Sequence, residues 1–98
     1  NIRERVVRAR QIQEARFQNS STRNNSGMTR KELEVHAQLS DSSRKILEQA
    51  MTKMGLSARA YDRILKVART LADLAEQQNV ETLHVAEAIQ YRNLDRPI

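Results

Sequence analysis

The clearest hydrophobic pattern in this chain lies in its second half, between Ser57 and Gln77. Apolar residues recur there at intervals of three and four positions, namely Tyr61, Ile64, Leu65, Ala68, Leu71, Ala72 and Ala75. This spacing places them on one face of an α-helix and leaves the charged residues on the other. Serine is a favoured N-cap residue, so the sequence predicts an amphipathic helix that begins after Ser57 and ends near Gln77.

A weaker stripe opens the chain, in NIRERVVRARQIQEARFQ. Its apolar residues approximate helical spacing and are expected to face the core, namely Ile2, Val6, Val7, Ala9, Ile12, Ala15 and Phe17. A short helix is predicted after Thr29, because Thr29 and Glu32 stand at the spacing of a capping box. Leu33, His36 and Ala37 are expected on the inner face of that helix.

Two further helices flank the strongest one. The segment SDSSRKILEQAMTKMG is predicted to form a helix that Asp41 or Ser42 caps and Gly55 ends. Its inner face is expected to carry Ile46, Leu47, Ala50, Met51 and Met54. The segment LHVAEAIQYRNL is predicted to form the last helix, with Thr82 as its cap and an inner face of Leu83, Val85 or Ala86, Ile89 and Leu94.

Polar residues dominate one stretch, residues 19–28, which is rich in Ser and Asn. These residue types compete with helical hydrogen bonding and favour turns, so the stretch is predicted to be a mobile linker. No strand-like alternation of useful length is present. Residues 1–98 are therefore expected to form a single all-α domain, a small bundle of four to five helices.

The composition agrees with a helical domain and indicates the cellular compartment in which it acts. Gly 2 and Pro 1 are far too few for a β-rich protein with many tight turns. The absence of cysteine excludes disulfide and thiolate chemistry and suits a reducing compartment. With no signal peptide or membrane-spanning apolar run, we expect a cytoplasmic protein without a membrane partner. Because the chain begins with Asn1, we expect it to be part of a longer polypeptide.

The charge is distributed unevenly along the chain. Residues 1–31 hold eight cations and two anions, whereas the remaining residues hold nine cations and ten anions. The basic excess therefore lies in the first third, where five arginines form a candidate surface for nucleic acid or a neighbouring domain, namely Arg3, Arg5, Arg8, Arg10 and Arg16. A solvated, arginine-rich helix accounts for the same charge without any partner.

Sequence motifs argue against a self-contained active site. Two glycines cannot supply a phosphate-binding loop or a dinucleotide-binding fingerprint. His36 and His84 lie on separate predicted helices with no carboxylate at metal-ligand spacing, so no metal site is expected. No cysteine and no recognisable Ser, His and Asp arrangement is available for nucleophilic catalysis.

Arg59 occupies an unusual place for a cation. It lies in the first turn of the predicted helix that follows Ser57, where the helix dipole favours anions. Exposed N–H groups and a forked guanidinium together form a plausible phosphate contact, and Arg63 and Lys66 follow on the same face. Arg44 and Lys45 also occupy a first turn without an evident role, so an ordinary surface arginine remains the alternative.

Four segments of the chain resemble a known family when they are taken together. IRERVVRARQIQ, ELEVHAQL, GLSARAYDRILKVARTLADL and HVAEAIQYRNLDR occur in the order found in the C-terminal domain of magnesium chelatase-like AAA+ ATPases. The resemblance covers the chain from Ile2 to Arg96. It implies a helical lid that follows a nucleotide-binding AAA+ core.

The resemblance also implies a role for one residue of this chain. Arg59, in the local sequence SAR, matches the sensor 2 arginine, which contacts the γ-phosphate of ATP. In this clade the arginine generally acts across a subunit interface. The parent protein would then be a homohexameric ATPase that uses ATP and Mg²⁺ bound mainly by the N-terminal AAA+ core of the same chain. This fragment alone would bind no nucleotide tightly.

The resemblance points to a branch whose members are ATP-driven DNA helicases that promote branch migration during natural transformation. DNA is therefore an expected partner of the full-length protein. Two alternatives remain at this point. In the first, the chain is a free-standing basic helical module that binds nucleic acid. In the second, it is the lid of a true magnesium chelatase subunit.

Overall fold

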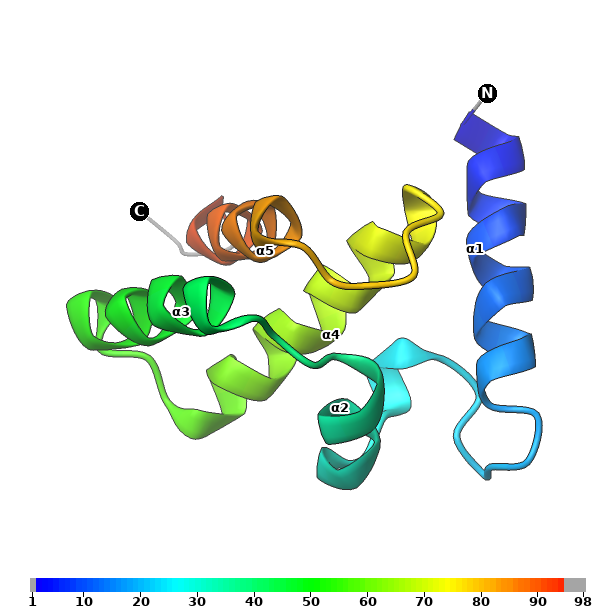
Figure 1. Cartoon of the computed structure of the whole chain (residues 1–98), viewed down its shortest axis with the longest axis horizontal. Helices are drawn as coiled ribbons and strands as arrows, with labels where there is room; N and C mark the ends of the chain where they lie inside the picture. Colours follow the sequence, from blue (N-terminus) through cyan, green and yellow to red (C-terminus); the bar gives the residue numbers. More distant parts are fainter. Residues whose placement is uncertain (1, 95–98) are drawn as a thin grey trace.

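Helix α4 (Ala58–Leu74) runs through the middle of the molecule in the computed structural model, which describes residues 2–94 and the side chains of residues 2–91. α4 packs with α1, α2 and α5, while α3 packs mainly with α5 (Figure 1). The described residues contain no strand, which confirms the predicted all-α bundle. The other elements are α1 (Ile2–Arg16), the 3-10 turn η1 (Asn25–Gly27), α2 (Arg30–His36), α3 (Asp41–Met54) and α5 (Thr82–Leu94).

Three predicted helix ends are confirmed by their capping contacts. Thr29 and Glu32 form the capping box that begins α2. Gly55 ends α3 in the left-handed conformation, with φ of 62°, and Ser57 caps α4. The prediction for the start of α3 was wrong, because Ser40 rather than Asp41 or Ser42 caps it. The Ser40 hydroxyl accepts a hydrogen bond from the Ser43 backbone N–H at 3.1 Å.

α4 ends at Leu74, three residues earlier than the hydrophobic spacing predicts. Glu76 adopts φ of 55°, and the chain turns back there. The Gln77 backbone N–H then donates to the Ala72 carbonyl at 2.8 Å. These contacts form a C-terminal helix cap in which glycine is the usual residue at the left-handed position. A glutamate there gives no sequence signal, which explains why the helix was predicted to be too long.

The start of α5 also differs from the prediction. Thr82 is the first helical residue rather than the cap, so the preceding residue, Glu81, holds the capping position. The Glu81 backbone N–H donates to Nδ1 of buried His84 at 2.9 Å. Leu83 is 65% exposed instead of facing inward, and Val85 rather than Ala86 enters the core.

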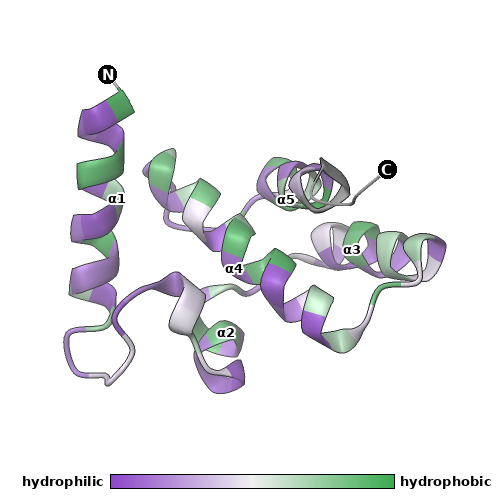
Figure 2. Ribbon diagram, turned by 180° about the vertical axis from the view of Figure 1, so that it is seen from behind, coloured by the Kyte–Doolittle hydropathy of each residue, from purple (hydrophilic) through white to green (hydrophobic). Residues whose placement is uncertain are grey.

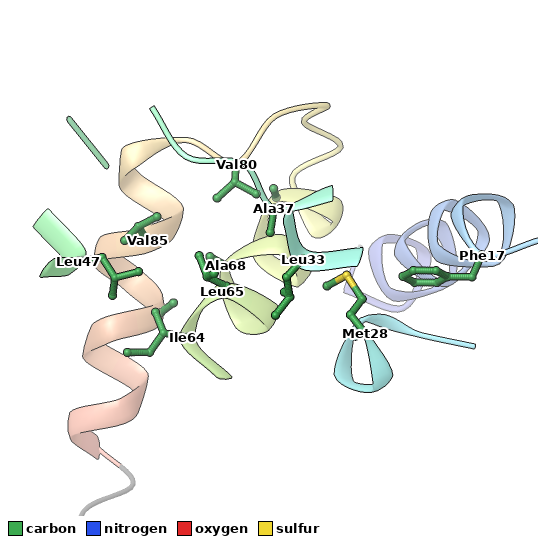
Figure 3. Packing of buried hydrophobic residues seen from close by; sticks show 12 residues of the cluster. Phe17, Met28, Leu33, Ala37, Leu47, Ile64, Leu65, Ala68, Val80 and Val85 are labelled. Carbon is green, nitrogen blue, oxygen red and sulfur yellow. The ribbon is translucent and has the colours of Figure 1, made fainter. Parts of the chain in front are cut away.

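The hydrophobic core extends along α4 as an elongated cluster. Figure 3 shows Leu47, Ile64 and Val85 at one end and Phe17 at the other, with Met28 between Phe17 and the rest. Leu47 and Val85 are completely buried. Burying a side chain of this size contributes roughly 1.5–3 kcal/mol relative to exposure, so this end supplies much of the folding energy.

The apolar stripe predicted for α1 does not face the core. Ala9 is the one buried residue of this helix, while Ile2, Val6 and Val7 are exposed and Ala15 also faces solvent. The helix stands to one side of the other elements (Figure 1), and polar and apolar residues are mixed along it (Figure 2). Its stripe of apolar residues is therefore not a core-facing face, although Phe17, just beyond the helix, is buried.

The predicted linker at 19–28 is anchored in its second half. Asn25 is 2% exposed and Met28 is 3% exposed, so both lie in the interior. The segment forms η1, in which the Asn24 side chain accepts a hydrogen bond from the Gly27 backbone N–H. Ser and Asn side chains thus serve here as fixed hydrogen-bonding groups rather than as markers of a loose connection.

Candidate functional site

The start of α4 presents Arg59 to solvent. Gly55 turns the chain after α3, and the Ser57 hydroxyl then accepts a hydrogen bond from the Ala60 backbone N–H at 3.3 Å. Arg59 is the second residue of α4 and is exposed. The local sequence therefore fixes the arginine at a helix N-terminus, as predicted, with its guanidinium free to reach an anion.

A hollow of about 580 Å³ follows the same face of α4. It brings Arg59 together with Arg63 and Lys66, while η1 contributes Ser26 to its edge; the remaining lining residues are Asp62, Val67, Thr70 and Leu71. The three cations are spaced by about one helical turn each, so they form a row along α4. The structure thus joins Arg59 to the two neighbours that share its face.

The hollow carries a net positive charge. Asp62 is its one acidic lining residue, and its carboxylate lies 3.7 Å from the Arg30 guanidinium on α2. Within the described part of the chain, no ion pair engages Arg59, Arg63 or Lys66. The hollow can therefore attract an anion.

The five candidate arginines of the first helix do not form one surface. The Arg16 guanidinium turns inward onto Asp73, with Nη2 2.6 Å from Oδ1. Arg5 Nε donates to the Leu74 carbonyl at 3.4 Å, and Arg8 Nε lies 3.4 Å from a carboxylate oxygen of Glu76. Arg3 and Arg10 alone in this set have no hydrogen bond or ion pair to another described residue.

Sequence reasoning misses the most buried charges of the molecule. The Asp73 carboxylate is fully buried and accepts hydrogen bonds from Arg16, Asn25 and Arg69, at 2.6 to 3.0 Å. We call these four residues the Asp73 cluster. The one signal was their spacing, because Arg69 and Asp73 lie four residues apart beside the apolar stripe of α4, so they can pair with each other.

Arg69 is held by the backbone as well as by Asp73. Its guanidinium donates to the carbonyl oxygens of His36, Gln77 and Gln78 at distances of 3.1, 2.8 and 2.9 Å, respectively. Burial lowers the pKa of Arg69, and these carbonyl groups offset part of the cost of burying a second cation beside one carboxylate. The Asp73 cluster therefore ties α1, η1, α4 and the loop after α4 to one another.

The family described as "Magnesium chelatase, subunit ChlI C-terminal" matches residues 1–92 of this chain. The chain belongs to this family. It is 43% identical to the competence protein ComM of Haemophilus influenzae over 95 residues, which is 97% of this chain and 18% of the relative. It is 36% identical to the uncharacterized protein YifB of Escherichia coli and 33% identical to YifB of Salmonella typhimurium, with the same coverage.

This magnesium chelatase C-terminal domain thus spans less than a fifth of the length of the relatives it matches. Within its described residues, no group of three His, Cys, Asp or Glu side chains is placed to hold a metal ion. No helix in the same part of the chain is long and apolar enough to cross a bilayer. The hollow beside Arg59 is the candidate site that contains the arginine singled out by the sequence.

Proposed function

We propose that this domain is the helical lid of an AAA+ ATPase of the ComM type and that Arg59 is its sensor 2 arginine. The carrying observation is the exposed Arg59 guanidinium at the capped start of α4, on the edge of a hollow that has a positive charge. Membership of the magnesium chelatase C-terminal family supports the assignment to a lid. The identity of 43% to ComM favours a competence-type parent over a true magnesium chelatase subunit.

In this proposal Arg59 distinguishes ATP from ADP by the presence of the γ-phosphate. A charge-assisted hydrogen bond from a guanidinium to a phosphate oxygen is strong and directional, and it disappears when the phosphate leaves. The lid then has different contact energies in the two nucleotide states, which is what a coupled movement requires. The nucleotide and Mg²⁺ are bound mainly by the AAA+ core, which lies outside these 98 residues.

The full-length protein would act as a homohexamer in the cytoplasm. It would couple ATP hydrolysis to unwinding and branch migration of DNA during natural transformation. Arg59 would then contact nucleotide either in its own subunit or in the neighbouring one. A free-standing nucleic-acid module is less well supported, because three of the five arginines on α1 are engaged within the domain.

The test is the ATPase rate of the full-length parent carrying Arg59→Ala. We expect a loss of at least about tenfold, or roughly 1.4 kcal/mol of transition-state stabilisation. Arg44→Ala is a matched control, because Arg44 is an exposed arginine in the first turn of α3 and lies outside the hollow. Arg63→Ala measures how far a neighbour within the hollow contributes.

A normal rate for the Arg59→Ala hexamer would overturn the sensor assignment. A loss of equal size in Arg44→Ala would do the same, because it would indicate a general effect of removing surface charge. Salt titration of DNA binding by the 98-residue chain tests the alternative function. Appreciable binding near physiological salt with a steep salt dependence would favour a nucleic-acid module over a lid.

A further inference from the structure

One side of α1 carries aliphatic side chains that have no place in the core. Ile2 is 78% exposed, Val7 is 47% exposed and Val6 is 40% exposed. None of them belongs to the hydrophobic cluster that Figure 3 shows. Several exposed aliphatic residues gathered on one helix are characteristic of a contact surface rather than of a solvated one.

These side chains share a face with Arg3 and Arg10, the two arginines of α1 that have no hydrogen bond or ion pair to another described residue. Ile2, Val6 and Arg10 follow one another at intervals of four residues, and Arg3 and Val7 form a second row beside them. We call these five residues the outer face of α1. The outer face covers the first two to three turns of the helix, and Glu14 lies one turn beyond Arg10.

The composition of the outer face is that of a protein interface. The core of an interface between proteins is apolar, and arginine is enriched there whereas lysine is depleted. All five cations of α1 are arginines, and the outer face contains no carboxylate. Against DNA, the three aliphatic side chains would lie among phosphates, which is an unfavourable arrangement for both surfaces.

We propose that the outer face of α1 docks against an acidic, apolar-edged protein surface in the part of the parent chain outside these 98 residues. The relatives are more than five times as long as the matched region, so ample protein is available to cover it. The two arginines select acidic partner groups, and the aliphatic residues supply the buried area. This inference goes beyond the proposed function and does not depend on Arg59.

Thiol labelling of the full-length parent tests this inference, since the 98 residues contain no cysteine. Ile2→Cys and Val6→Cys are introduced singly, with any other cysteine of the parent replaced by serine. Gln49→Cys, at an exposed position of α3, is the reference. Relative to the urea-unfolded parent, we expect labelling at positions 2 and 6 to be slowed at least about tenfold more than at position 49.

Charge reversal then tests the chemistry of the partner. Arg3→Glu combined with Arg10→Glu should speed labelling of Val6→Cys at least about threefold, because like charges would oppose each other across the contact. Arg44→Glu combined with Lys45→Glu, on exposed positions of α3, should leave that rate unchanged. Unchanged labelling in the first double variant would overturn the acidic nature of the partner surface.

Labelling of Ile2→Cys and Val6→Cys as fast as Gln49→Cys would overturn the docking proposal. Protection that arises only when DNA is added would also overturn it and would assign the outer face to nucleic acid. The labelling is done without ATP. A failure of the Arg59 hypothesis would therefore leave this result intact, and the two proposals can fail separately.

Discussion

Helices α5 and α1 both pack against α4, but they do so through opposite chemistry. α5 contributes Val85 and Ala88 to the apolar core, where they lie with Ile64 of α4. α1 buries only Ala9, and its firm attachment is the Arg16 guanidinium on the buried Asp73 carboxylate. α4 therefore holds one neighbouring helix by apolar area and the other by directed hydrogen bonds.

The difference separates folding energy from orientation. Apolar burial is non-directional, so the α5 contact stabilises the domain without strictly defining an angle. A bidentate contact between arginine and a carboxylate is satisfied in only one geometry, so the Asp73 cluster sets the direction in which α1 leaves the bundle. If α1 carries the docking surface proposed above, that direction is the property that matters.

The contact of α1 with α4 through the Asp73 cluster is called the polar joint, and the contact of α5 with α4 through Val85, Ala88 and Ile64 the apolar joint. The largest expected effect comes from breaking the polar joint. Asp73→Ala would leave the buried Arg16 and Arg69 guanidinium groups without their carboxylate, at a cost of about 3–5 kcal/mol in the free energy of unfolding. Urea unfolding of the 98-residue chain measures this loss. Hydrogen exchange should show that α1 loses protection before α4 and α5 do.

Asp62→Ala is the matched control for the polar joint. Asp62 lies on the same helix and pairs with Arg30 at 3.7 Å near the surface, so its loss should cost less than about 1 kcal/mol. If Asp73→Ala proves no more costly than Asp62→Ala, the contrast between the two joints does not hold.

A somewhat smaller effect is expected in the apolar joint. Ile64→Ala removes a side chain that is 2% exposed and should cost about 3 kcal/mol through lost burial and the cavity left behind. Here hydrogen exchange should rise in α3, α4 and α5 together. Leu83→Ala, at a 65% exposed position of α5, should change stability by less than about 0.5 kcal/mol. Selective exposure of α1 in Ile64→Ala would contradict the comparison.

The smallest expected effect is a loss of stability in acid, at the segment that connects α1 to α2. Hydrogen bonds from the Thr22 hydroxyl and the Thr29 backbone N–H lower the pKa of Glu32 to about 2. Because the pKa is lower in the folded state than its usual 4.5, this stabilisation is full above pH 4.5 and is lost as the pH falls towards 2. The pH dependence of thermal unfolding measures it.

Glu32→Gln should flatten the acid limb of that profile, whereas Glu34→Gln on the same helix, at an exposed position, should not. The pKa of His36 is also lowered, chiefly by burial and then by nearby Arg16. The unfolded chain therefore binds a proton at His36 more readily than the folded one, and the same region loses stability as the pH falls below 6.5, so the α1 side should open first in acid. Identical acid limbs for the two glutamine variants would show that the Glu32 contacts contribute nothing.

The sequence by itself determined the helices and several of their ends. Periodic apolar residues define α3 and α4, and the capping box at Thr29, the glycine at position 55 and the serine at position 57 act through neighbouring backbone groups alone. Such local contacts depend on residues three or four positions apart, which is why they could be predicted. Arg59 at the start of α4 was predictable for the same reason.

Only the tertiary structure decided which charged and apolar residues are buried. Asp73 is buried because Arg16 and Asn25, 57 and 48 residues away, reach it in the fold. Its burial and the exposure of the apolar side of α1 depend on how α1 meets α4, and no local pattern contains that information.

The grouping of Arg59, Arg63 and Lys66 was implied by one helix, but the hollow beside them needed η1 to pack against α4. Short-range spacing sets the elements, whereas long-range hydrogen bonds and packing set which of their faces remain open for a partner.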